Sequence, residues 1–127
     1  MRCSLPFAHR AYLCGLGVAD ATVVRCFHGP IIEEVIFRGA AFSVIYMTAC
    51  SSRVLAHCRI GLSIVGSSLL FVLCHGRASG VPWMVIFLMG NAYALLRWRS
   101  NSAATSAVMH ATYNCAIAIA MIHAAGV

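Results

Sequence analysis

The chain has 127 residues, of which 61% are hydrophobic and 9% are charged, and its formal net charge is +6. Because a soluble domain usually has about 25% charged residues, this composition excludes a water-soluble protein and indicates an integral membrane protein. The positive charge comes from arginines scattered between apolar runs, whereas nucleic-acid-binding proteins cluster their basic residues, so a nucleic-acid partner is also excluded.

The N-terminal residues differ in composition from the rest of the chain. The stretch AYLCGLGVADATVV, residues 11–24, is too polar and too rich in glycine for a confident membrane span. Arg10 interrupts the region that would form the apolar core of a signal peptide. We therefore interpret residues 1–28 as a short interfacial helix or a remnant of a longer protein, and residues 29–127 as the membrane core.

Four apolar runs follow, and each predicts a membrane-spanning helix. They are residues 31–50, a run that begins between residues 54 and 60 and ends at residue 75, residues 81–96, and residues 102–125. Lipid permits only helices or closed barrels, and the runs lack the alternation of barrel strands. The predicted fold is an all-α membrane bundle of about four transmembrane helices. Gly29-Pro30 is predicted to start the first helix, and residues 97–102 to separate the last two.

Ionisable residues inside apolar helices are costly and usually functional. On the first predicted helix, Glu34 and Arg38 are four residues apart, so they share a helix face and can pair. Glu33 points about 100° away from that face and has no partner on its own helix. We expect it to be protonated, bonded to another helix or in contact with water, which makes it a candidate general base. The alternative places both glutamates at the membrane surface, in the first turn after Pro30.

Three more polar side chains lie in the other predicted helices. His75 ends the second helix one turn after Phe71, and His110 and Asn114 are four residues apart in the fourth. Each alone has a structural explanation, such as a helix cap or a hydrogen bond between helices. Together with Glu33 they supply the groups that activate a water and stabilise an oxyanion. Glu33, His75 and His110 could equally hold zinc, because two histidines and a carboxylate form a common catalytic zinc set.

The motifs that carry these residues resemble those of a known family. The stretch EEVIFRG resembles the EExxxR motif of the CAAX protease and bacteriocin-processing (CPBP) family, whose intramembrane endopeptidases include the type II CAAX prenyl protease. The stretches FVLCH and HATYN resemble the family's FxxxH and HxxxN motifs. All three occur in the family's order and spacing on separate apolar runs, and the resemblance covers residues 29–120.

The resemblance implies an intramembrane endopeptidase that cleaves a membrane-associated peptide or a prenylated CAAX protein. Glu33 would activate the attacking water, which His75 would help to position. His110 and Asn114 would polarise the scissile carbonyl and stabilise the tetrahedral intermediate. The supporting residues would be Glu34, Arg38 and Phe71.

Cofactor and activity stay open at this point. The resemblance is compatible with a zinc ion on Glu33, His75 and His110, and also with a metal-free mechanism centred on glutamate. Family members usually carry further spans before the EExxxR helix, which motivates a second hypothesis of a catalytically inactive membrane scaffold or bacteriocin self-immunity protein. Glutamate and histidine within spans also mark ion pathways, which motivates a third, a small transporter or proton-relay subunit.

Overall fold

The computed structural model describes residues 22–51, 55, 57–75 and 82–124, and all regular structure in these residues is helical. One continuous helix covers residues 22–51 and is called the first helix below. Its elements are η1 (Val24–His28), α3 (Gly29–Glu34), η2 (Val35–Ala41) and α4 (Phe42–Ser51). The other helices are α5 (Arg59–His75), α6 (Trp83–Ser100) and α7 (Ala103–Ala124). The predicted all-α fold is confirmed.

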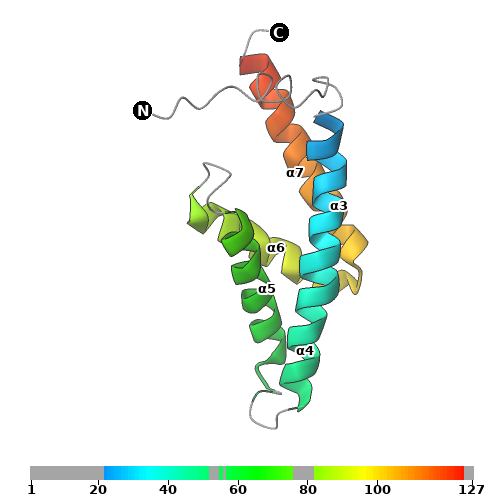
Figure 1. Ribbon diagram of the computed structural model, residues 1–127, viewed down its shortest axis with the longest axis vertical. Helices are drawn as coiled ribbons and strands as arrows, with labels where there is room; N and C mark the ends of the chain where they lie inside the picture. Colours follow the sequence, from blue (N-terminus) through cyan, green and yellow to red (C-terminus); the bar gives the residue numbers. More distant parts are fainter. Residues whose placement is uncertain (1–21, 52–54, 56, 76–81, 125–127) are drawn as a thin grey trace.

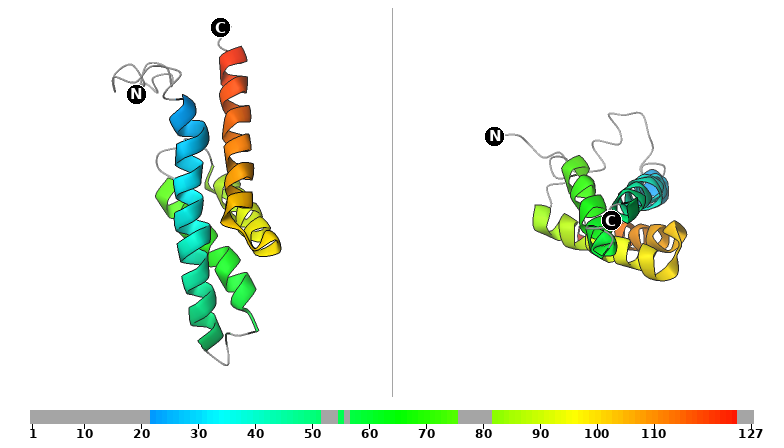
Figure 2. Two further views of the ribbon diagram at one scale, coloured as in Figure 1. Left: turned by 90° about the vertical axis from the view of Figure 1, so that its right-hand side faces the viewer. Right: turned by 90° about the horizontal axis from the view of Figure 1, so that it is seen from below.

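The first helix contacts all the other helices. Figure 1 shows α7 beside α3, in the N-terminal half of the first helix, and α5 beside α4, in its C-terminal half. Helix α6 crosses between them and packs against both α5 and α7, as the turned views in Figure 2 also show. Side chains from α5, α6 and α7 therefore converge on the middle of the first helix, where α3 continues into η2.

The first helix begins earlier than predicted. Helical residues extend back to Thr22, so the predicted start at Gly29-Pro30 is wrong. Pro30 lies inside the helix, directly after η1, a π-helical turn in which the N–H of Gly29 donates to the carbonyl of Val24, five residues earlier. Membrane helices tolerate an interior proline where such a local adjustment and neighbouring side chains satisfy the freed backbone groups. Gly29-Pro30 therefore marks a change in the backbone hydrogen bonding inside the helix and not the start of the helix.

This earlier start changes the surroundings of the two glutamates. They do not lie in the first turn of the helix, and Glu34 is fully buried in the bundle, so the first-turn position that the alternative gave them is wrong. The helix also runs through the boundary drawn between residues 28 and 29. Residues 1–21 lie outside the described residues, so the division into an N-terminal segment and a core stays a prediction.

The remaining helices match the predicted runs with shifted ends. Helix α5 ends at His75 as predicted, whereas α6 continues beyond the predicted end at Leu96 to Ser100. It ends at Asn101, whose backbone has φ 52° and ψ 27°, a left-handed conformation that asparagine tolerates better than most residues. Ser102 then accepts the N–H of Ala104 on its hydroxyl oxygen and caps the start of α7.

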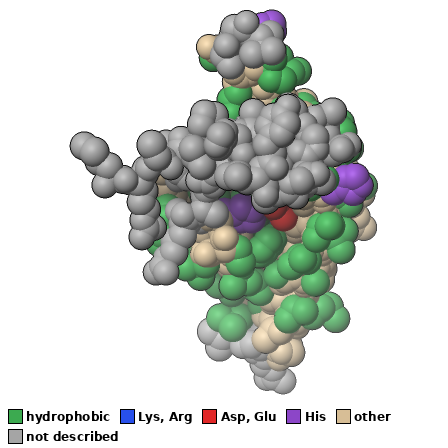
Figure 3. Space-filling model, turned by 45° about the horizontal axis from the view of Figure 1, so that its top comes forward, with side chains coloured by type: hydrophobic (Ala, Val, Ile, Leu, Met, Phe, Trp, Pro, Cys, Tyr) green, Lys and Arg blue, Asp and Glu red, His purple; other side chains and the backbone are tan. Residues whose placement is uncertain are grey.

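Several polar side chains are buried in the bundle beside a small apolar core, while many large apolar side chains lie on its surface. The buried polar side chains are Glu34, Arg38, Ser63, Ser67, Ser68, Ser106 and His110. Large hydrophobic side chains such as Ile32, Leu73, Leu88 and Val108 are exposed, and hydrophobic side chains dominate the described part of the face in Figure 3. This distribution suits lipid as the surrounding solvent. Helix α7 is long and apolar enough to cross a membrane, and α5 is similarly apolar but shorter.

Candidate active site

Glu33 faces one histidine on each of two other helices. Its Oε1 atom lies 3.1 Å from Nε2 of His75, at the end of α5, and its Oε2 atom lies 3.7 Å from Nε2 of His110, in α7. The side chains of Glu33 and His75 are 29% and 28% exposed, while that of His110 is 8% exposed. The structure thus brings together three of the four residues proposed from the sequence to be catalytic.

The backbone of α5 determines which nitrogen of His75 carries a proton. Nδ1 of His75 lies 2.8 Å from the carbonyl oxygen of Phe71. A carbonyl can only accept, so Nδ1 is the donor, and in a neutral ring Nε2 presents a lone pair to Glu33. The 3.1 Å contact between Nε2 and the carboxylate then requires one proton, carried by either His75 or Glu33. The two side chains therefore act as a pair that shares a proton.

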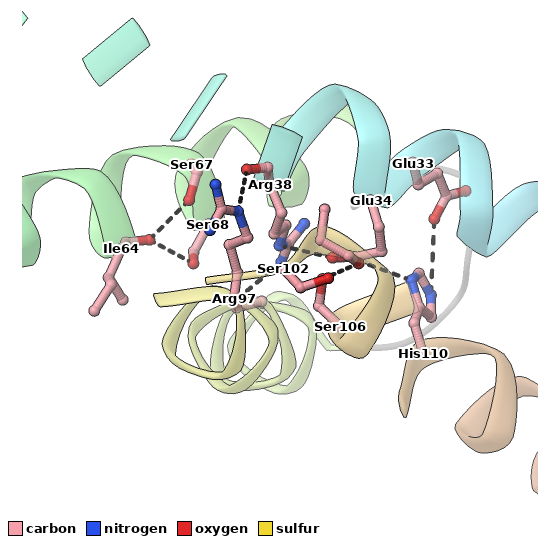
Figure 4. A network of polar contacts seen from close by, with 12 residues as sticks. Glu33, Glu34, Arg38, Ile64, Ser67, Ser68, Arg97, Ser102, Ser106 and His110 are labelled. Atoms are coloured by element: carbon pink, nitrogen blue, oxygen red, sulfur yellow. Dashed lines mark hydrogen bonds and ion pairs between the residues drawn. The ribbon is translucent and has the colours of Figure 1, made fainter. Parts of the chain in front are cut away.

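Glu34 orients His110 in the same way, as Figure 4 shows. Oε1 of Glu34 lies 3.1 Å from Nδ1 of His110, and its Oε2 lies 3.2 Å from Nε of Arg38, as the i,i+4 spacing predicted. Both partners of the Glu34–Arg38 ion pair are fully buried. A carboxylate paired with a guanidinium accepts hydrogen bonds and does not donate them, so Nδ1 of His110 is the donor in its contact with Glu34. Nε2 of His110 is thereby turned toward Glu33.

Arg38 is held from several sides within the bundle. Its Nη2 donates to the carbonyl of Gly90 on α6 at 2.8 Å. Its Nη1 has no hydrogen-bond partner among the described residues, but the guanidinium carbon lies 4.5 Å from the ring centroid of Phe71 and 5.5 Å from that of Tyr93. Aromatic faces attract a desolvated cation, so these rings offset part of the cost of burying Arg38.

Tyr93 is a site residue that the sequence analysis missed. Its ring is 1% exposed and stacks on the imidazole of His110, with centroids 4.8 Å apart and planes at 21°. Phe71, which the FxxxH motif had indicated, stacks on His75 in the same manner at 4.3 Å and 28°. Nothing in the sequence around Tyr93 signalled a role, because the apolar part of α6 contains no charged residue or histidine. A single tyrosine within an apolar run does not distinguish a site residue from a packing residue.

Asn114 lies near the site without contacting Glu33. Its side-chain amide donates to the backbone carbonyl of Arg25 at 3.1 Å. That carbonyl lies five residues before Pro30, which has no N–H to continue the π-helical bonding of η1. An asparagine amide has two N–H groups, so one remains for another partner.

A cavity of about 400 Å³ adjoins these side chains. Its polar lining includes Glu33, His75, Tyr93, His110 and Asn114. Its apolar lining includes Val85, Ile86, Met89, Ile117 and Met121. Figure 3 shows an acidic side chain beside a histidine side chain on this face of the molecule. A space of this size with a few convergent polar groups is typical of a binding site for a small ligand or a peptide segment.

Comparison with known families identifies the chain. The family model described as type II CAAX prenyl endopeptidase Rce1-like matches residues 17–116. The chain belongs to this family. The match includes all three motifs and confirms the resemblance to the CAAX protease family. The Rce1-like family is a family of membrane-integral CAAX-type proteases, so the chain is a member of a hydrolase family of the membrane. No curated protein and no solved structure matches the chain.

Zinc on Glu33, His75 and His110 was one expectation for this Rce1-like chain. Among the described residues, no group of three His, Cys, Asp or Glu side chains is arranged to hold a metal ion. Each carboxylate oxygen of Glu33 instead faces a different imidazole, and the contact with His75 engages the atoms that would bind the metal. In this arrangement the residues do not fit a zinc site, and we derive no step through a metal.

Proposed function

We propose that this Rce1-like protein is an intramembrane endopeptidase that cleaves a membrane-associated peptide or a prenylated CAAX-type protein. One observation carries the proposal: Glu33 lies between Nε2 atoms of two histidines from different helices, at the side of a cavity. Both histidines have their other nitrogen held by a hydrogen bond, so they present Nε2 to Glu33 in a fixed orientation. Such a preorganised set suits proton transfer to and from a bound water.

Glu33 acts as the general base in this proposal. When the shared proton resides on His75, Glu33 is a carboxylate that can accept a hydrogen bond from a water in the cavity. As the water oxygen attacks the carbonyl carbon of the peptide, Glu33 takes its proton. Glu33 then returns a proton to the leaving nitrogen as the C–N bond breaks, so the products are a carboxylic acid and an amine.

His110 and Asn114 stabilise the oxyanion in the same proposal. His110 donates to Glu34 through Nδ1, so it can donate to an oxyanion from Nε2 only as an imidazolium. Glu34 lies 3.1 Å from Nδ1 and accepts the hydrogen bond of this nitrogen. Asn114 contributes the N–H that does not bond Arg25. Two such donors can lower the barrier substantially, since one donor of this kind typically contributes about 10²–10³ in rate.

The lining of the cavity supports an apolar substrate segment. The cavity is also lined by Ile86, Met89 and Ile117, whose side chains cannot hydrogen-bond a polar group. Apolar contact would leave the peptide carbonyl as the group oriented by the polar side. The partners that this proposal implies are the lipid bilayer and a peptide or prenylated protein delivered from it.

The proposal is tested by cleavage of a quenched prenylated CAAX peptide by protein purified in detergent. We expect Glu33→Ala and His110→Ala to abolish cleavage while the protein remains folded. His123→Ala is the matched control, because His123 is exposed near the end of the same helix, α7, and does not line the cavity. A chelator arm with zinc add-back measures metal dependence in parallel.

Normal cleavage by both Glu33→Ala and His110→Ala would contradict the proposed mechanism. If folded wild-type protein cleaves neither the prenylated peptide nor a membrane-embedded peptide, and the site variants keep their biological function, the inactive scaffold becomes the better interpretation.

A further inference from the structure

The hydrogen-bond spacing of the first helix changes at the end of η2. The N–H of Phe42 donates to the carbonyl of Phe37, five residues earlier, as in a π-helix. Helix α4 begins at Phe42, after which each bond spans four residues. Where the backbone bonds change from spanning five residues to spanning four, one carbonyl receives no backbone N–H. Here this is the carbonyl of Arg38. A backbone carbonyl without a donor is costly inside a membrane protein.

Arg97 on α6 supplies a donor to this carbonyl. Its Nε lies 3.3 Å from the carbonyl oxygen of Arg38, a contact drawn in Figure 4. Its Nη1 donates to Oδ1 of Asn101 at 3.2 Å, and its guanidinium carbon lies 5.8 Å from the ring centroid of Phe42. Asn101 is the left-handed residue that ends α6. The guanidinium is therefore fixed between the π-helical turn and the connection from α6 to α7.

The turn that Arg97 contacts determines where the Arg38 side chain points. From this turn, Arg38 reaches Glu34 at 3.2 Å and the carbonyl of Gly90 at 2.8 Å. Glu34 in turn contacts Nδ1 of His110 at 3.1 Å. A rotation of the Arg38 backbone would therefore change the orientation of His110 through two contacts between buried side chains.

We propose that Arg97 is a positioning residue for the active site, and this inference rests on the proposed function. Arg97 binds the carbonyl released by η2 and so keeps Arg38 and Glu34 aligned with His110. It does not line the cavity and has no contact with the reacting atoms. Its role is to hold the π-helical segment η2 of the first helix from outside the site.

Arg97→Met removes both hydrogen bonds, and we expect kcat to fall by about tenfold or more with little change in KM, because small displacements of catalytic groups cost rate. Arg97→Lys keeps the charge but replaces the two nitrogens that contact Arg38 and Asn101 with a single ammonium nitrogen, so an intermediate kcat is expected. Arg99→Met is the control, since Arg99 lies on the same helix and contacts the ring of Trp98 instead. We expect this control to retain the wild-type kcat.

A second measurement separates this inference from the proposed function. The ¹⁵N shifts of the His110 imidazole report which nitrogen carries the proton, whether or not the peptide is cleaved. We expect a proton on Nδ1 in wild type and in Arg99→Met, and a mixture of protonation states in Arg97→Met. If Arg97→Met does not fold, Asn101→Gly serves instead, because glycine keeps the left-handed conformation and removes the acceptor of Arg97. Wild-type kcat together with unchanged His110 shifts in these variants would overturn the inference.

Discussion

The Nδ1 atom of His110 lies 3.1 Å from Oε1 of Glu34, although the two residues are 76 positions apart in the sequence. The contact joins α7 to the first helix inside the bundle, where the side chains of both residues are almost completely buried. It makes Glu34 more than a structural partner of Arg38, because the same carboxylate determines the direction in which His110 presents its second nitrogen to Glu33.

Removal of the Glu34 charge should destabilise the protein strongly. Glu34→Gln leaves the buried guanidinium of Arg38 without an ionised partner, and we expect a loss of about 3–5 kcal/mol in the free energy of unfolding. Denaturant unfolding in detergent, followed by circular dichroism, measures the loss. The double variant Glu34→Gln, Arg38→Met removes both charges and should recover most of it. A double variant less stable than the single one would contradict the expected role of the buried pair.

A methyl group at Gly90 should disturb the contact between α5 and α6. A Cβ atom there would lie 3.2 Å from Cβ of Ser68 and 3.4 Å from Nη2 of Arg38. We expect Gly90→Ala to cost about 1–3 kcal/mol through overpacking and to weaken cleavage by displacing Arg38. Gly61→Ala is the matched control, since a Cβ at Gly61 meets nothing within 4 Å and alanine favours the helix. Equal unfolding midpoints for the two variants would contradict this packing.

The ring of Tyr93 should matter more for activity than its hydroxyl. Tyr93 stacks on His110 through its ring, so Tyr93→Phe should keep kcat within about twofold of wild type, whereas Tyr93→Leu should lower it by about tenfold. Steady-state cleavage of the quenched peptide measures both. If Tyr93→Phe loses as much activity as Tyr93→Leu, the hydroxyl itself takes part in the reaction.

Asn114 should have separable effects on stability and on cleavage. Its bond to the carbonyl of Arg25 replaces one that Pro30 cannot make, so Pro30→Ala introduces an N–H able to bond a freed carbonyl of η1. We expect Asn114→Ala to reduce both stability and kcat in wild type. In the Pro30→Ala background the stability effect of Asn114→Ala should shrink, while the effect on kcat should stay. Unfolding midpoints and kcat from the four proteins of this cycle test the separation. A kcat effect that also disappears in that background would assign Asn114 a structural role alone.

Local spacing predicted part of the site from the sequence. The four-residue spacing predicted the contact between Glu34 and Arg38. The 100° offset predicted that Glu33 has no partner on its own helix, and in the structure it contacts His75 of α5. Which helices supply its partners depends on packing between apolar faces, and the similar composition of the apolar runs does not reveal that packing. The motifs marked His75 and His110 as candidates, but their approach to Glu33 came from the fold.

The π-helical turns could not be predicted, and the error at Pro30 followed from them. Hydrophobic periodicity does not distinguish bonds that span five residues from bonds that span four, so Pro30 was interpreted as a helix start. Arg97 was assigned to a break between helices because arginine is rare in a membrane span. In the structure it belongs to α6 and bonds the carbonyl that η2 releases.

The length of the first helix has a consequence for the membrane around it. Residues 22–51 extend about 45 Å, while the hydrocarbon core of a bilayer is about 30 Å thick, so the helix must tilt or protrude. Glu33 lies roughly 17 Å along this helix, and its depth therefore changes with tilt. Thinner bilayers would tilt the helix further and move Glu33 relative to the lipid headgroups. A change in membrane thickness would thus change how deep the cavity lies in the bilayer and how readily water enters it.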